Sequence, residues 1–150
     1  MSPKCLSLRR FIQNKTERME RWEFEFEYLR TQHYIKDQLK QEALPDMNTI
    51  LLLIGLQELG RWKKDLSKEE KQDLMHIAVC RLLSIKGYYH FKGRDADGWP
   101  HFEQLRPIEL KGEESQERML KELVIQYFDH LQKEHNRLSN QNKSFKHEEE

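Results

Sequence analysis

One apolar segment, residues 47–59, constrains the fold of this chain more than any other feature of its sequence. Pro45 disfavours helix at the residue before it, Asp46 is suited to cap a helix that begins next, and Gly60 suits the position just after its end. Because almost no polar face is left between these signals, the segment is predicted to be the buried central helix. Gly55 within it costs about 1 kcal/mol of helix propensity relative to alanine, which predicts that a neighbour approaches closely there.

A second helix is predicted between two equally clear signals. Ser67 and Glu70 have the spacing of a capping box, and Gly87 is a stop after the last apolar position. Since only a short connection separates this helix from the central one, the two are predicted to lie antiparallel. Cys80 falls on its apolar face and is predicted to be a small core residue, and a thiol like Cys5.

Residues 15–41 admit two interpretations. The segment lacks Gly and Pro, and apolar residues recur along it at three- and four-residue spacing, which is typical of a helix. The run from Trp22 to Tyr28 alternates apolar and acidic residues instead, which is typical of a strand. We favour the helix, in which Phe24 and Tyr28 point away from the seam and one of the two aromatic sides meets another element or a partner. The seam comprises Met19, Trp22, Phe26 and Leu29.

Residues 88–106 are predicted to form a β-hairpin around an Asp/Gly turn. A two-residue turn at Asp97 and Gly98 would place Lys92 opposite Glu103. A four-residue loop over residues 95–98 is preferred, because it sets two aromatic residues face to face and offers a cation–π contact. Its pairs are Arg94 with Trp99, Lys92 with His101, His90 with Glu103 and Phe91 with Phe102.

The preferred register gives the hairpin two faces. Tyr89, Phe91 and Phe102 are expected to cover the helices. The opposite face is expected to meet solvent or a partner, and its predicted partner-binding residues are Arg94, Trp99, His101, Lys92 and His90.

A last helix is predicted from about residue 112. The fold class is therefore mostly α: an antiparallel three- to four-helix bundle with one docked β-hairpin. Residues 1–14 are expected to be a basic flexible tail, residues 15–135 a single helical domain that includes the hairpin, and residues 136–150 a polar disordered tail.

Composition excludes several classes of protein. The 26 basic and 26 acidic residues cancel, which argues against a protein that coats nucleic acid or anionic lipid. The longest apolar run falls well short of the roughly 20 residues of a membrane-spanning helix, and the start of the chain lacks the apolar stretch of a signal peptide. We expect a cytoplasmic protein, although the basic N-terminus also has some features of an organellar presequence.

No motif for catalysis, for a cofactor or for a metal is recognisable. Asp95 and Asp97 suggest a calcium loop, but the remaining ligand positions would fall on Gly93 and Gln104, so turn chemistry is the better interpretation. The sequence therefore predicts no catalytic, cofactor-binding or metal site.

Two stretches carry a resemblance. Residues 71–78, Lys-Gln-Asp-Leu-Met-His-Ile-Ala, and residues 95–101, Asp-Ala-Asp-Gly-Trp-Pro-His, resemble a group of small uncharacterised bacterial proteins. The resemblance covers residues 48 to about 128 and implies no activity.

Three classes of function follow from these patterns. The first is a non-enzymatic interaction protein that presents the hairpin face, or the aromatic segment of residues 22–28, to a protein partner. The second is association with RNA or the ribosome through the hairpin and the basic tail. The third is a small enzyme built around His90, His101 and nearby carboxylates. Neither the identity of a partner nor the oligomeric state can be read from the sequence.

Overall fold

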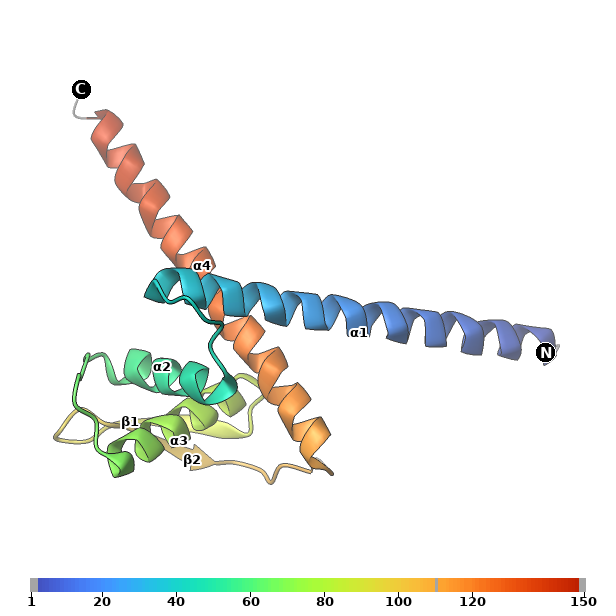
Figure 1. Cartoon of the computed structure of the whole chain (residues 1–150), viewed down its shortest axis with the longest axis horizontal. Helices are drawn as coiled ribbons and strands as arrows, with labels where there is room; N and C mark the ends of the chain where they lie inside the picture. Colours follow the sequence, from blue (N-terminus) through green and yellow to red (C-terminus); the bar gives the residue numbers. More distant parts are fainter. Residues whose placement is uncertain (1–2, 110, 149–150) are drawn as a thin grey trace.

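The computed structural model describes the backbone of residues 3–109 and 111–148, and the side chains of residues 21–109 and 111–144 (Figure 1). This part of the chain is mostly helical and contains one two-stranded antiparallel hairpin, as the sequence predicts. The elements are α1 (Pro3–Leu39), α2 (Met47–Leu59), α3 (Lys68–Ile85), β1 (Tyr89–Arg94), β2 (Pro100–Gln104) and α4 (Glu113–Glu148).

α2 is the buried central helix that its composition predicts. The Asp46 side chain accepts a hydrogen bond of 2.8 Å from the backbone N–H of Thr49, which caps the start of the helix. Gly60 ends it at a φ of +74°, in the left-handed region that favours glycine. Ile50 and Ile54 have no exposed surface, so the helix lies at the centre of the main core.

α3 runs antiparallel to α2 and lies directly against it (Figure 1). The predicted capping box is confirmed, because Ser67 Oγ accepts a hydrogen bond of 3.1 Å from the Glu70 N–H. The predicted close approach at Gly55 is also confirmed: a Cβ built there would collide with the carbonyl group of Leu74. Glycine at this position therefore sets how near the two helix axes come.

The core has two parts. A main cluster draws buried residues from all four helices, among them Ile54, Leu82 and Leu123. A second, smaller cluster of Leu56, Leu59 and Leu74 lies between α2 and α3, and Trp99 of the hairpin loop packs against it. The hairpin is thus docked on the helices through the loop as well as through its strands.

α1 is a helix throughout residues 22–28, so the strand alternative is wrong. Its two aromatic sides differ sharply. Tyr28 is 7% exposed, with the Lys121 ammonium group of α4 5.0 Å from the centre of its ring. Trp22 on the other side is 71% exposed, and Phe26 is 50% exposed. The side that points away from the seam thus contacts the core, and Trp22, Phe26 and Leu29 of the seam face solvent.

The register of the hairpin agrees with the preferred prediction in two of its four pairs. His90 lies opposite Glu103 and Phe91 opposite Phe102, as in the preferred register. Beyond Phe91 a β-bulge shifts the register by one residue, so that the predicted pairs of Lys92 with His101 and Arg94 with Trp99 are wrong. The residues opposite each other there are Gly93 with His101 and Arg94 with Pro100.

The two long helices extend beyond the predicted domain. α1 begins at Pro3 and α4 continues to Glu148, so both helices extend into the segments of residues 1–14 and 136–150 that the sequence analysis expected to be tails. Figure 1 shows α1 and α4 crossing, with the N-terminal half of α1 projecting away from α2, α3 and the hairpin. The C-terminal half of α4 projects likewise on the far side of the crossing.

We expect Gly55→Ala to lower the free energy of unfolding by about 2 kcal/mol, because the new methyl group must push α2 away from the Leu74 backbone. Urea unfolding followed by circular dichroism measures this loss. Gln57→Ala, at an exposed position of the same helix, is the matched control and should change the free energy by less than about 0.5 kcal/mol. Equal effects of the two substitutions would contradict the close packing of α2 on α3.

Candidate functional site

The loop of the hairpin is organised by Asp95. One of its carboxylate oxygens accepts hydrogen bonds from the backbone N–H groups of Asp97, at 2.9 Å, and Trp99, at 3.0 Å. The other lies 2.9 Å from His101 Nε2. The contact with His101 and these backbone bonds hold the pKa of Asp95 below its usual range. Asp95 thus has the turn chemistry that was preferred over a calcium site.

Arginine side chains fasten the same loop to the end of α2. Arg94 donates one hydrogen bond of 2.6 Å to the carbonyl oxygen of Glu58 and another of 3.0 Å to that of Gly98. Arg61 donates one of 2.5 Å to the carbonyl oxygen of Asp97. Arg94 was predicted to meet a partner, but its guanidinium group is turned onto the backbone of its own chain.

The sequence analysis predicted Trp99 on a free face of the hairpin. The structure shows instead that Trp99 is half-buried against Leu56, Leu59 and Leu74. Phe91, predicted to cover the helices, is 47% exposed and has its ring against that of Phe102. The bulge begins only after the Phe91–Phe102 pair, so the assignment of these two aromatic residues to the faces of the hairpin is corrected by how the hairpin packs on the helices.

Lys92, His90 and His101, the three other predicted partner-binding residues, are exposed, as is Arg94. Lys92 forms an ion pair of 3.1 Å with Glu103, and His101 pairs with Asp95. His90 is exposed on the strand beside them. Of the five predicted residues, Arg94 and Trp99 therefore anchor the loop to the helices, and Lys92 and His101 each contact a carboxylate of the hairpin.

A cleft of about 370 Å³ between α3 and the hairpin is the place where the enzyme hypothesis has to be judged. His101, His76 and Cys80 line it, and His76 Nε2 lies 3.7 Å from Cys80 Sγ. Burial raises the pKa of the Cys80 thiol, whereas a nucleophilic cysteine needs a lowered one. Asp95 is bonded to two backbone groups of the turn as well as to His101. The cleft therefore favours a structural role for these residues over a catalytic one.

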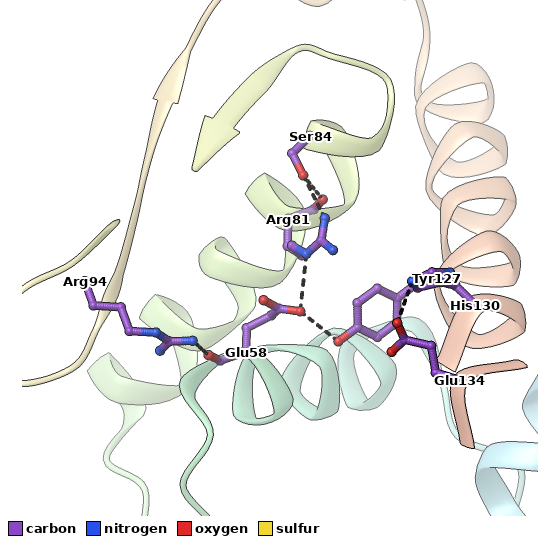
Figure 2. Close-up of polar contacts among 7 residues, drawn as sticks. All are labelled: Glu58, Arg81, Ser84, Arg94, Tyr127, His130 and Glu134. Atoms are coloured by element: carbon purple, nitrogen blue, oxygen red, sulfur yellow. Dashed lines mark hydrogen bonds and ion pairs between the residues drawn. The ribbon is translucent and has the colours of Figure 1, made fainter. Parts of the chain in front are cut away.

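A polar network that the sequence analysis did not find lies between α2, α3 and α4 (Figure 2). Glu58 Oε1 accepts a hydrogen bond of 2.9 Å from the Tyr127 hydroxyl and lies 3.3 Å from Arg81 Nε. Burial, and then the nearby Glu58 carboxylate, raise the pKa of the Tyr127 hydroxyl. The network joins one residue from each of three helices and so serves to fix their relative positions.

Among the described side chains, a pair of exposed aromatic residues lies side by side on α1 together with an exposed leucine. We call this group the α1 strip and define it as Trp22, Phe26 and Leu29, which are 71%, 50% and 42% exposed. The rings of Trp22 and Phe26 are stacked, with their centres 5.8 Å apart and their planes inclined by 11°. Trp22 and Phe26 of the strip belong to the segment of residues 22–28 that the sequence analysis named as an alternative contact surface, and Leu29 directly follows it.

Comparisons with known proteins add no family to these observations. No protein-family model matches the chain, and no curated protein or solved structure is significantly similar to it. Within the part of the chain that the structure describes, no helix has an apolar stretch long enough to cross a lipid bilayer.

We expect Trp99→Ala to lower the free energy of unfolding by about 2 kcal/mol, because it empties the contact with the second core cluster. Trp62→Ala is the matched control: that tryptophan is 72% exposed, and its loss should change the free energy by less than about 0.5 kcal/mol. Chemical unfolding of both variants measures the difference. If Trp99→Ala left the free energy of unfolding unchanged, Trp99 would belong to a free face of the hairpin, as the sequence analysis predicted.

We expect Tyr127→Phe to alter the stability of the protein at alkaline pH. The raised pKa of Tyr127 keeps the hydroxyl protonated in the folded chain where the unfolded chain, with a pKa of 10.0, ionises. The contribution of this pKa difference to the free energy of unfolding is fully present below pH 10. Above pH 10 the free energy of unfolding falls by about 1.4 kcal/mol per pH unit. Tyr127→Phe removes this contribution, while Tyr28, whose pKa burial also raises, keeps its own.

Urea unfolding of wild type and Tyr127→Phe at a series of pH values from neutral to alkaline measures the two slopes. The variant should lose less free energy than the wild type as the pH rises above 10. Parallel curves for the two proteins would show that Tyr127 is not the buried, carboxylate-bound hydroxyl described here.

Proposed function

We propose that this protein is a non-enzymatic interaction module of the cytosol that contacts a protein partner through the α1 strip. The observation that carries the proposal is the stacked, exposed pair of Trp22 and Phe26 on a helix whose opposite face is buried in the core. Large aromatic side chains are the residues that contribute most binding energy when an interface covers them. Exposed to water, the strip contributes less to folding than the buried side of the same helix.

The contrast with α4 supports a binding role for the strip. Exposed positions of α4 carry polar contacts between neighbouring turns: Lys133 forms an ion pair of 2.9 Å with Asp129, and His130 lies 3.4 Å from Glu134. A helix with such polar contacts on its surface is stable in water without a partner. The α1 strip instead places three large apolar side chains side by side on the surface.

The hairpin supports RNA association less well. Of its cations, Lys92 is paired with Glu103 and Arg94 is bonded to two carbonyl oxygens of its own chain. Single-stranded nucleic acid is bound by exposed aromatic residues in a positively charged groove. Because Trp99 packs on the core and these cations are engaged, the hairpin has less to offer a nucleotide than the sequence suggested.

Site-specific photo-crosslinking in living cells tests the proposal. A benzophenone amino acid replaces Phe26 in one full-length variant and Phe91 of the hairpin in a second. The two phenylalanines are similarly exposed, at 50% and 47%, so they form a matched pair. We expect ultraviolet light to give a covalent adduct with protein from position 26 and none from position 91.

The opposite pattern, an adduct from position 91 alone, would move the contact surface to the hairpin. Adducts from neither position would contradict the proposal that this chain acts through a protein contact. An adduct with RNA in place of protein would favour the second class of function over the first.

A further inference from the structure

The α1 strip has the spacing of a coiled-coil seam. Trp22, Phe26 and Leu29 are separated by four and three residues, and His33, also exposed, follows after four more. These positions alternate between d and a of a heptad, with Phe26 at a. In the same register the earlier a and d positions of the sequence hold Met19, Lys15, Ile12 and Leu8.

The opposite face of α1 is already occupied. Tyr28 and Ile35 are 7% and 3% exposed and belong to the main core cluster. Tyr28 follows Trp22 by six residues, which places the two on different sides of a helix with 3.6 residues per turn. α1 can therefore hold its own core on one face and receive a second helix on the other.

The N-terminal half of α1 needs such a second helix for its own stability. Figure 1 shows it projecting from the crossing with α4, away from the other elements. In proteins most of the stability of a helix comes from packing and little from intrinsic propensity. A partner helix along the seam would supply that packing.

We infer that the α1 strip pairs with the α1 strip of a second copy of this chain, in a parallel two-stranded coiled coil. The inference rests on the proposed function and names its partner. It makes the protein a dimer in which each copy keeps the core described above.

Charges beside the seam fit a parallel pair. In that arrangement a g position of one helix lies opposite the e position five residues further along the other. Glu25 is at g and Arg30 at e, so opposite charges meet twice by symmetry. Arg30 lies 3.5 Å from Glu27 within its own helix, in an exposed ion pair weak enough to be exchanged. One heptad earlier, position 18 holds Arg and position 23 holds Glu.

The position of the core on α1 also favours the parallel arrangement. The other elements are attached near the C-terminal end of α1, and its N-terminal half is free of them (Figure 1). Two parallel helices can pair along the whole seam, with the two cores on opposite sides at one end. Antiparallel helices would drive each N-terminal half against the core of the other copy.

Sedimentation equilibrium of the full-length chain tests the inference. We expect a mass twice that of the chain, and a dissociation constant raised at least about 30-fold by Phe26→Asp. Phe91→Asp, at a similarly exposed phenylalanine outside the seam, is the control and should leave the dissociation constant unchanged. Circular dichroism checks that both variants keep the folded core.

Charge reversal tests the direction of the pair. Glu25→Arg alone sets two arginines together in the parallel dimer, and Arg30→Glu alone sets two glutamates together. Each should raise the dissociation constant about fivefold, and the double variant should restore it, because the opposite charges are merely exchanged. In an antiparallel pair Glu25 would approach Gln32, so Glu25→Arg alone would be tolerated.

A monomer at every concentration overturns the inference, and so does a dimer that Phe91→Asp dissociates while Phe26→Asp does not. Photo-crosslinking from position 26 separates this failure from failure of the proposed function. An adduct twice the mass of the chain supports the dimer. An adduct with a different protein, from a chain that is monomeric in solution, overturns the dimer and leaves the interaction module standing.

Discussion

The close approach of α2 to α3 at Gly55 is the constraint on which the rest of the structure depends. Because no side chain separates Gly55 from the Leu74 backbone, two helices that are buried along most of their facing surfaces come together. The second core cluster forms where the two helices meet, and Trp99 packs against it. The same two helices carry Glu58 and Arg81, and Glu58 bonds to both Arg81 and Tyr127 of α4. The hairpin and α4 are thus both positioned by the same helix pair.

α1 differs from α2 and α3 because it carries apolar residues on two sides. Tyr28 and Ile35 use one side to close the main core, and Trp22 and Phe26 hold the other side out to solvent. Folding of a single chain explains the first side only. We propose that a contact between proteins accounts for the second side, and the heptad spacing of the strip is the reason for proposing a second α1 helix as the partner.

Local signals in the sequence were reliable where a few neighbouring residues determine the structure. Asp46, Ser67 and Gly55 were each assigned their observed role. The hairpin was located correctly, but the bulge after Phe91 was not foreseen, because its register depends on how Trp99 and Arg94 dock on α2. The same docking covers part of Trp99 and binds the guanidinium group of Arg94, which are two of the five predicted contact residues.

The polar network and the choice between the two faces of α1 were beyond sequence reasoning for a related reason. Glu58 and Tyr127 are 69 residues apart, and neither carries a local sign that it will meet the other. The alternating run of residues 22–28 predicted two aromatic faces but did not indicate which of them would pack on the core. Contacts between distant segments decide both questions.

Hydrogen exchange of the intact chain as a function of its concentration tests the central claim most directly, because it observes the backbone of α1 itself. The account predicts that amides in the N-terminal half of α1 and around the strip become more protected as the concentration rises, while those of α2 and α3 stay equally protected throughout. Protection of α1 that is independent of concentration, and unchanged when Trp22 and Phe26 are replaced by serine, would contradict it.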